Sequence, residues 1–284
     1  MRLILLTSIL TLVVPLAANA QADTAFSVPI EVKSQGVTLR AILHVAAGPG
    51  PHATFVVLKG FPGGRSQAFP AFMQAKGFNA ISPNFRGQLD SDGTYDVAGT
   101  AADVAAIVDY LRSDSAQRAF RIDPRRIAIA GTSAGSYAAL SAGAADESVR
   151  CVALVVPFNW AIPLLEMRNN PLVRAAMVGQ LQSMTSGSSA VRLDTSFVSR
   201  TIDAAEVVDL RSAATRLQGH DVLMIGAQRD QTAPLDTHFT PVRDALRAAQ
   251  ATVRDTILDD THNLPATTQT VFELTATWLR GCVR

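Results

Sequence analysis

Short continuous apolar runs recur along the chain and alternate with longer segments in which apolar residues have helical spacing. The runs lack the polar–apolar alternation of strands that face water on one side, so they are typical of strands buried on both faces of a parallel sheet. They are residues 53–58, 78–82, 127–130, 152–156, 222–225 and 253–258. Two further strand-like runs, 26–34 and 37–45, flank a turn at Gln35-Gly36 and predict an opening antiparallel hairpin.

Amphipathic helices are predicted between the runs. Residues 101–111 carry a stripe of apolar side chains at helical spacing, and residues 134–145 are rich in Ala. Residues 236–249 and 265–279 have the pattern of amphipathic helices as well. The alternation of strand and helix predicts an α/β fold with a mostly parallel, doubly wound sheet and helices on both faces.

The segment between the strands at 152–156 and 222–225 breaks this alternation. It contains about sixty residues, whereas connections in α/β units usually take about 2–6. Its apolar residues indicate helices, and 183–189 has the composition of a polar loop. The apolar residues are Leu164, Leu165, Leu172, Val173, Met177, Leu181 and Met184. We predict that 157–219 is an inserted, mainly helical cap over a functional site, and extra packing at the sheet edge is the alternative.

The length and charge of the chain limit the class of protein. The chain has 284 residues, 48% of them hydrophobic, and a formal net charge of +1. One α/β domain of roughly 200–250 residues plus an insertion fits this length. The balanced charge gives no large field of one sign, which argues against nucleic acid or an acidic membrane surface as the main partner.

Residues 1–20 are predicted to be an export signal. Met1-Arg2 supplies a positive start, residues 3–16 are almost wholly apolar, and Ala18-Asn19-Ala20 has the small-residue pattern of a cleavage site. The apolar run is short for a bilayer span, which needs ~20 residues, and an uncleaved anchor is the alternative. We expect one mature α/β domain over 21–284, located in the periplasm or outside the cell, with no stable membrane anchor.

The strongest local motif is Gly131-Thr132-Ser133-Ala134-Gly135. It follows the run at 127–130 directly and opens the Ala-rich helix. A nucleophilic Ser on a sharp strand-to-helix turn holds a strained backbone, and glycines on both sides of it remove side chains that would clash. The helix N-terminus stabilises negative charge beside the Ser. We predict that Ser133 is a catalytic nucleophile and that Gly131 and Gly135 form its elbow.

A Ser hydroxyl needs a base to become a good nucleophile. His262 lies in the loop between the last strand and the last helix, and such loops gather at the carboxyl edge of a parallel sheet, beside the Ser turn. The base in turn needs an acid that fixes its tautomer. Asp230 follows the strand at 222–225, at the same edge. We predict that Ser133, His262 and Asp230 form a triad.

Other His and Asp residues are weaker candidates for these roles. The remaining His residues lie in early strands, before a strand or at the start of a predicted helix: His44, His52, His220 and His238. Asp236 is interpreted as a residue of a helix N-cap region. Asp259 and Asp260 are interpreted as solvated residues or as caps of the last helix.

The tetrahedral intermediate of acyl transfer needs hydrogen-bond donors for its oxyanion. The glycine-containing loop at 59–64 follows the strand at 53–58, which is where the first donor is expected. We predict that the backbone N–H groups of Phe61 and Ala134 are the two donors. For Gly63-Gly64, a plain flexible turn is the alternative.

No metal site is predicted. Residues 90–96 vaguely resemble a calcium loop, but they lack the third acidic ligand before the Gly and the distal Glu of such loops. The sequence has no Cys/His cluster with zinc spacing and no glycine-rich nucleotide motif.

Together these motifs resemble an α/β hydrolase. The elbow at 131–135, the Asp turn at 226–230 and the Asp-x-His at 260–262 carry the resemblance, in the chain order Ser, Asp, His. Asn84-Phe85-Arg86-Gly87 followed by residues 91–93 is similar to the loop after the fourth strand in the prolyl-oligopeptidase and dienelactone-hydrolase branch. The resemblance covers nearly the whole mature chain. It implies an α/β-hydrolase fold and hydrolysis of esters, thioesters or amides without a cofactor.

Three features depart from the family pattern. Lys59 stands where many relatives have His, and Leu89 takes a position where small residues are common. The N-terminal β-propeller of true prolyl oligopeptidases is not expected, because few residues of the predicted mature chain precede the oxyanion loop. This departure weakens a peptidase hypothesis.

We predict a carboxylic-ester hydrolase that acts on a small acyl substrate. A small peptidase or amidase of the same fold is the first alternative. A non-catalytic binding protein that keeps the fold is the second, and loss of a triad residue would be its mark. Fold alone does not specify the substrate.

The two cysteines, Cys151 and Cys282, are predicted to form a disulfide. Export would place them in an oxidising compartment. Cys151 starts a strand and therefore lies at the amino edge of the sheet. The last helix runs back from the carboxyl edge, so Cys282 at its end returns to the amino edge. The Cα atoms of a disulfide must come within ~7 Å, which this placement allows; two unrelated buried thiols are the alternative.

Overall fold

The computed structural model describes residues 24–185 and 190–283. The predicted export signal at 1–20 lies outside these residues. Of the helices in the two ranges, none has both the length and the apolar content that crossing a membrane requires.

Within the described residues, eight strands form one sheet in the order β1-β2-β4-β3-β5-β6-β7-β8. They are β1 (Phe26–Ser34), β2 (Val37–Val45), β3 (His52–Leu58), β4 (Asn79–Pro83), β5 (Ile122–Thr132), β6 (Cys151–Val155), β7 (Asp221–Ala227) and β8 (Thr252–Leu258). β1 and β2 form the predicted hairpin, β2 pairs antiparallel with β4, and the strand pairs from β4 to β8 are parallel. The mostly parallel sheet is thus confirmed.

Successive side chains of the central strands are buried on opposite faces of the sheet. On β3, Val56 and Leu58 belong to one core cluster, whereas Phe55 and Val57 belong to the other. Both faces of the sheet are therefore buried from solvent at these strands, which explains why the strands appear in the sequence as continuous apolar runs.

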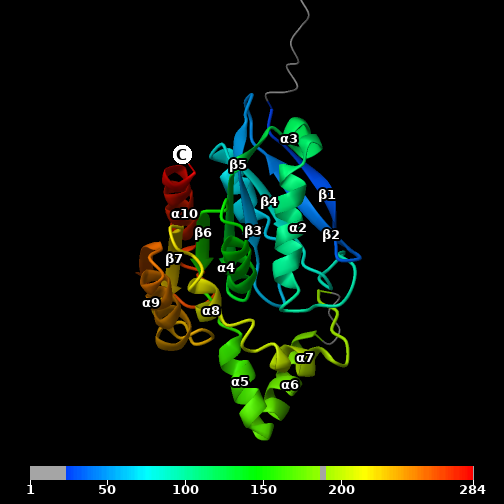
Figure 1. Ribbon diagram of the computed structural model, residues 1–284, viewed down its shortest axis with the longest axis vertical. Coiled ribbons are helices and arrows are strands. Elements are labelled where there is room, and N and C mark those ends of the chain that lie inside the picture. The colour runs from blue at the N-terminus through cyan, green and yellow to red at the C-terminus, as the bar shows by residue number, and fades with distance from the viewer. Residues whose placement is uncertain (1–23, 186–189, 284) are drawn as a thin grey trace, which may run out of the picture.

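Helices cover both faces of the sheet (Figure 1). One face carries α1 (Ala68–Ala75) and α10 (Thr268–Cys282). The other face carries α2 (Thr100–Arg112), α4 (Gly135–Ala145), α8 (Leu210–Ala214) and α9 (Thr240–Ala248), with α3 (Asp114–Phe120) after α2. The doubly wound arrangement predicted from the sequence is confirmed.

Two predicted helices have different beginnings in the structure. The last helix starts at Thr268 rather than at 265, because Asp260 accepts hydrogen bonds from the backbone N–H groups of Ala266 and Thr267 and holds them in the preceding loop. The helix predicted at 236–249 begins as a π-helical turn, η2 (Leu235–Phe239), and continues as α9. The apolar pattern also did not predict α1 and α3, which have only 8 and 7 residues.

The insertion predicted at 157–219 contains α5 (Ala161–Asn169), α6 (Pro171–Thr185), α7 (Phe197–Asp203) and α8. α5, α6 and α7 lie beyond the carboxyl ends of the strands, at the end of the molecule opposite the C-terminus (Figure 1). α8 differs from them, because it packs against α4 and α9 on the face of the sheet. We therefore use the term cap helices for α5, α6 and α7 alone. Residues 183–185 of the predicted polar loop are helical, since α6 continues to Thr185; residues 186–189 lie outside the described ranges.

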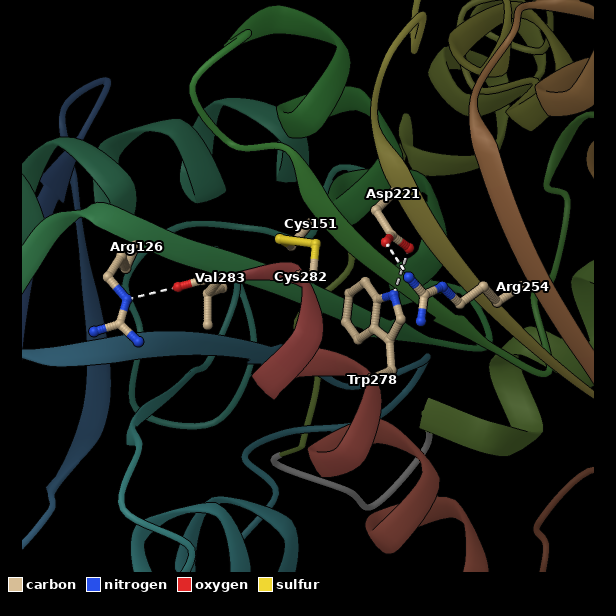
Figure 2. Close-up of a disulfide and its surroundings, with 7 residues drawn as sticks. All are labelled: Arg126, Cys151, Asp221, Arg254, Trp278, Cys282 and Val283. Carbon is tan, nitrogen blue, oxygen red and sulfur yellow. Dashed lines mark hydrogen bonds and ion pairs between the residues drawn. A yellow bond between two sulfur atoms is a disulfide. The ribbon is translucent and has the colours of Figure 1, made fainter.

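The last helix is tied to the amino edge of the sheet by the predicted disulfide. Cys151 is the first residue of β6 and Cys282 the last residue of α10, and their Cα atoms are 6.0 Å apart. Figure 2 shows further contacts at this edge, where the Trp278 indole N–H donates to Asp221 at 2.6 Å. Arg126 Nε donates to the backbone oxygen of Val283 at 2.6 Å. The end of α10 is thus held by a covalent bond and by polar contacts on both sides of it.

Candidate active site

Ser133 lies on a sharp turn between β5 and α4. Its φ angle of 53° is in the left-handed region, where a residue with a side chain is strained. Glycines permit this turn: a Cβ on Gly131 would lie 2.4 Å from the backbone oxygen of Gly135, and a Cβ on Gly135 would lie 2.7 Å from the backbone oxygen of Lys59. The Ser133 N–H donates to the oxygen of Val155 at 2.9 Å, which fixes the turn against β6.

Three side chains from three loops meet at the carboxyl edge of the sheet. His262 Nε2 lies 2.8 Å from Ser133 Oγ, and His262 Nδ1 lies 2.7 Å from Asp230 Oδ2. The other carboxylate oxygen of Asp230 accepts from the backbone N–H groups of Thr232 and Ala233, at 2.9 and 2.8 Å. An ionised carboxylate only accepts hydrogen bonds, so the neutral imidazole carries its hydrogen on Nδ1 and leaves Nε2 to accept from the Ser hydroxyl.

The loop that carries His262 is organised by Asp260. Its Oδ2 accepts from the N–H groups of Ala266 and Thr267, at 3.0 and 2.9 Å, and from the Thr267 hydroxyl at 2.8 Å. Burial raises the pKa of Asp260, but the hydrogen bonds from Thr261, Thr267 and Ala266 outweigh it and lower that pKa below its ordinary value. Asp260 is therefore a buried residue that holds the loop before α10, whereas Asp259 is exposed and pairs with a surface Arg.

The loop predicted to supply an oxyanion donor runs directly beside Ser133. A Cβ on Gly60 would lie 2.8 Å from Ser133 Cβ and 3.2 Å from Ser133 Oγ, so only glycine fits there. Gly63 has a φ of +44°, and a Cβ on it would lie 1.8 Å from the oxygen of Gly60. The backbone turns so tightly here that only glycine fits at positions 60 and 63. Phe61 and Ala134, the predicted donors, both line the cavity that contains Ser133.

A cavity of about 510 Å³ opens beside Ser133, under the cap helices. Most of its wall is apolar: Phe61, Phe158, Trp160, Ile162, Pro163, Met177 and Leu181. Its polar lining residues, apart from Ser133, are Glu166, Gln180, Gln231, Thr232 and His238. Trp160 packs edge-on against both Phe61 and Phe158, with ring centroids 5.8 and 5.2 Å apart. α5 and α6 of the cap thus complete an aromatic-walled cavity over Ser133.

The sequence analysis did not single out the segment Phe158-Asn159-Trp160 as part of the site. Phe158 lies three residues after the end of β6, at the same edge of the sheet as Ser133, and position after a parallel strand was the available indication. His238 was considered only as a base. The structure places it in the cavity wall, on η2, and it is His262 that lies within hydrogen-bond distance of Ser133 Oγ.

The other His residues lie elsewhere. His44 is on β2 beside Ser27, and the Nε2 atom of His220 lies 3.1 Å from the backbone oxygen of Gly143, near the end of α4. Among the residues of 24–185 and 190–283, no three His, Cys, Asp or Glu side chains cluster as metal ligands would.

The comparison with protein families decides the classification. A family model described as X-Pro dipeptidyl-peptidase (S15 family) matches residues 17–253. The chain belongs to this family. The matched region includes Ser133 and Asp230 and ends before His262, which the geometry adds to the same site.

Relatives of this S15 family member are distant. An uncharacterised 31.7 kDa protein in the traX-finO intergenic region of Escherichia coli is 29% identical over 154 residues, which are 53% of this chain and 52% of the relative. The chain thus spans about half the length of the curated relatives it matches.

Solved structures show the fold of this family member. The α/β hydrolase GrgF from Penicillium sp. sh18 has a TM-score of 0.69 at 15% identity, covering 90% of this chain and 99% of that chain. An esterase from Pyrococcus furiosus has a TM-score of 0.66 at 15% identity, covering 92% and 94%. Likeness at this identity establishes the α/β-hydrolase fold, and the resemblance inferred from the sequence motifs is confirmed. The family match, together with the α/β-hydrolase fold, identifies the protein as a member of a hydrolase family.

Proposed function

We propose that the protein is an exported serine hydrolase that cleaves a carboxylic ester through an acyl-enzyme on Ser133. The observation that carries this proposal is the unbroken hydrogen-bond chain from Ser133 through His262 to Asp230, placed beside a largely apolar cavity. Such a chain is recognised by the geometry and roles of its members.

In acylation, His262 Nε2 takes the proton of Ser133 Oγ while Oγ bonds to the carbonyl carbon of the ester. The Asp230 carboxylate stabilises the imidazolium that forms. The carbonyl oxygen becomes an oxyanion, which accepts hydrogen bonds from the N–H groups of Phe61 and Ala134. When the intermediate collapses, the C–O bond to the alcohol breaks and His262 returns its proton to the leaving oxygen.

In deacylation, a water molecule takes the place of the alcohol. His262 removes a proton from the water as its oxygen attacks the acyl carbon, and the same N–H groups hold the second oxyanion. The bond from the acyl carbon to Ser133 Oγ then breaks, and His262 protonates Oγ. The acid leaves and the site returns to its starting state, without any redox change or cofactor.

The composition of the cavity favours an ester over a peptide. Removal of a dipeptide from an amino terminus requires a group that captures the terminal ammonium ion, and a buried carboxylate serves this purpose best. Among the described residues that line the cavity, Glu166 is the one with a carboxylate, and it is an exposed residue rather than a buried one. A dipeptidyl-peptidase is the second candidate, because it is the activity in the description of the family.

Side-by-side assays separate the two candidates. p-Nitrophenyl butyrate and alanyl-prolyl-p-nitroanilide would be assayed, and each kcat/KM divided by the uncatalysed rate of its substrate. We expect the larger rate enhancement on the ester, with loss of activity in Ser133→Ala. A larger enhancement on the arylamide, with a KM that rises in Glu166→Gln, would establish the peptidase instead.

Export is supported by the signal pattern of residues 1–20 and by the disulfide, since disulfides persist in oxidising compartments. We expect the protein in the periplasm or the medium of its host, with an amino terminus at Gln21. Amino-terminal sequencing of the fractionated protein checks this. Full-length chain in the membrane fraction would show that residues 1–20 act as an anchor.

A further inference from the structure

A second imidazole, that of His238, is built into the wall of the cavity. His238 is 5% exposed and takes no part in the chain from Ser133 to Asp230. Its Nδ1 atom lies 2.9 Å from the backbone N–H of Asn159. A backbone N–H can only donate, so Nδ1 must be the unprotonated nitrogen of this ring. The neutral imidazole of His238 therefore carries its hydrogen on Nε2.

The His238 ring is held rigidly in this orientation. Phe158 stacks on it, with ring centroids 4.9 Å apart and an interplanar angle of 24°. Asn159, which supplies the N–H to Nδ1, is itself fully buried, and its side-chain amide donates to Asp209 at 2.8 Å. The amide oxygen of Asn159 accepts from the N–H of Leu210 at 3.1 Å. The His238 ring and the residues that hold it, Phe158 and Asn159, are thus fixed before any ligand binds.

The Nε2 hydrogen of His238 has no acceptor among the described residues, and the ring lines the same cavity as Ser133. One ring face is covered by Phe158 and Nδ1 is engaged, so Nε2 is the remaining polar atom that can meet a ligand. Trp160, in the same wall, has an indole N–H without a partner among these residues, but that N–H is fully buried. The Nε2–H of His238 is not among the buried unpaired groups of the described residues and its ring lines the cavity, so it is free to donate to a ligand that brings an acceptor.

We propose that His238 is a specificity-determining residue whose Nε2–H donates a hydrogen bond to the substrate group that fills the cavity. The substrate class is then an ester whose cavity-filling group carries an oxygen acceptor, such as an oxo or ether oxygen, on an otherwise apolar chain. This inference rests on the proposed ester hydrolase and narrows its substrate. A substrate without the acceptor leaves the donor unpaired and is discriminated against.

The donor is available over the whole working range of pH. Burial lowers the pKa of His238 to about 4; the charges of Asp230 and Asp236 oppose this shift, and that of His262 adds to it. The ring is thus neutral, with its hydrogen on Nε2, at any pH well above 4.

Two variants separate the Nε2–H donor of His238 from its Nδ1 acceptor, which holds the ring on the Asn159 N–H. In His238→Asn, the short amide can accept from the Asn159 N–H in the place of Nδ1 but does not reach the position of Nε2. In His238→Gln, the longer amide can place an N–H near the position of Nε2.

The test uses two series of esters. In the first, p-nitrophenyl hexanoate is compared with its 4-oxo and 5-oxo analogues; in the second, hexyl butyrate is compared with its 5-oxohexyl analogue. The measured quantity is the ratio of kcat/KM for each oxo ester to that of its plain partner.

We expect at least one oxo ester to be preferred by the wild type, and this ratio to fall about tenfold in His238→Asn, the equivalent of one hydrogen bond. In His238→Gln, the ratio should stay close to that of the wild type. His238→Phe, which keeps the stacked ring, should behave like His238→Asn. The wild-type ratio should also be constant from pH 6 to pH 9, since His238 does not titrate there.

Two outcomes would overturn the inference, and they are distinguishable. Equal ratios in wild type and His238→Asn for both series, with the plain esters still hydrolysed, would refute the role of His238 and leave the proposed function intact. Failure of the wild type to hydrolyse any of the esters or to react with a fluorophosphonate would refute the proposed function, and this inference with it.

Discussion

The two buried carboxylates near His262 have different tasks at the residue scale. Asp230 presents one oxygen to the imidazole and the other to two backbone N–H groups. The carboxylate oxygens of Asp260 accept hydrogen bonds from groups in the loop between β8 and α10. The first therefore acts on the charge and tautomer of His262, and the second acts on where the loop holds it.

Substitution of these two residues should separate the tasks. Asp230→Ala should lower kcat on p-nitrophenyl butyrate about 10⁴-fold, by analogy with the loss of the acid in other triads. Asp260→Ala should lower the melting temperature and reduce kcat far less. Steady-state kinetics and thermal unfolding of both variants check this. A loss of kcat in Asp260→Ala as large as that in Asp230→Ala would contradict the assignment.

His238 also links stability to pH. Burial lowers its folded-state pKa to about 4, whereas a His in an unfolded chain titrates at ~6.5. Between these values the unfolded state binds more protons, so the contribution of His238 is present above pH ~6.5 and is lost as the pH falls towards 4. The unfolding free energy of the wild type should therefore fall more steeply over this range than that of His238→Gln. Urea titrations at several pH values measure both slopes, and parallel curves would contradict the expectation.

The cap helices complete the cavity at the scale of the element. α6 contributes Met177 and Leu181 to the wall, and these side chains are half-buried. The same helix carries Leu172, which is 82% exposed and does not line the cavity. One helix thus offers both a test residue and a matched control for the role of the cap in substrate choice.

Truncation of the α6 wall should shift activity towards longer acyl groups. In Met177→Ala and Leu181→Ala, the ratio of kcat/KM for decanoate over butyrate esters should rise about fourfold for each additional methylene that the larger cavity buries. Leu172→Ala should leave this ratio unchanged. p-Nitrophenyl esters of graded length provide the measurement. An equal response of all three variants would show that α6 does not contact the acyl group.

The disulfide matters at the scale of the whole molecule, because it closes a loop with a sequence separation of 131 residues between Cys151 and Cys282. In the chain-entropy account, a loop of this size contributes ~4–5 kcal/mol, and measured values are often smaller. Cys282→Ser should therefore lower the melting temperature by about 10 °C. Reduction of the wild type should produce the same shift, and reduction of the variant should add nothing. A melting temperature that is insensitive to both changes would mean that packing alone holds α10.

Much of the architecture could be predicted because its determinants are local. The hairpin of β1 and β2 lies where the two strand-like runs and the Gln35-Gly36 turn predict it. The parallel strands were predicted from continuous apolar runs, which are typical of strands buried on both faces. Ser133, Asp230 and His262 were found because each follows a strand at the same edge of the sheet. The disulfide followed from the same argument about edges.

The rest depends on tertiary packing that no local pattern encodes. Which side chains of the cap helices face Ser133 depends on how α5 and α6 rest on the sheet, so the places of Met177 and Leu181 in the cavity wall could not be derived. The start of α10 depends on hydrogen bonds to Asp260 from residues six and seven positions later. The place of His238 in the cavity wall could not be predicted because a His at a helix start is ordinarily a surface residue, and only its contact with the Asn159 N–H reveals its tautomer.

The central claim is that Ser133 is an activated nucleophile, and active-site labelling tests it most directly. The purified protein would be incubated with a fluorophosphonate, digested and mapped by mass spectrometry, with Ser133→Ala and His262→Ala as parallel samples. We expect one modified peptide in the wild type, with the added mass on Ser133, no label in Ser133→Ala and slow labelling in His262→Ala, because the hydroxyl has lost its base. Modification of a different serine, or equal labelling of wild type and Ser133→Ala, would contradict the account.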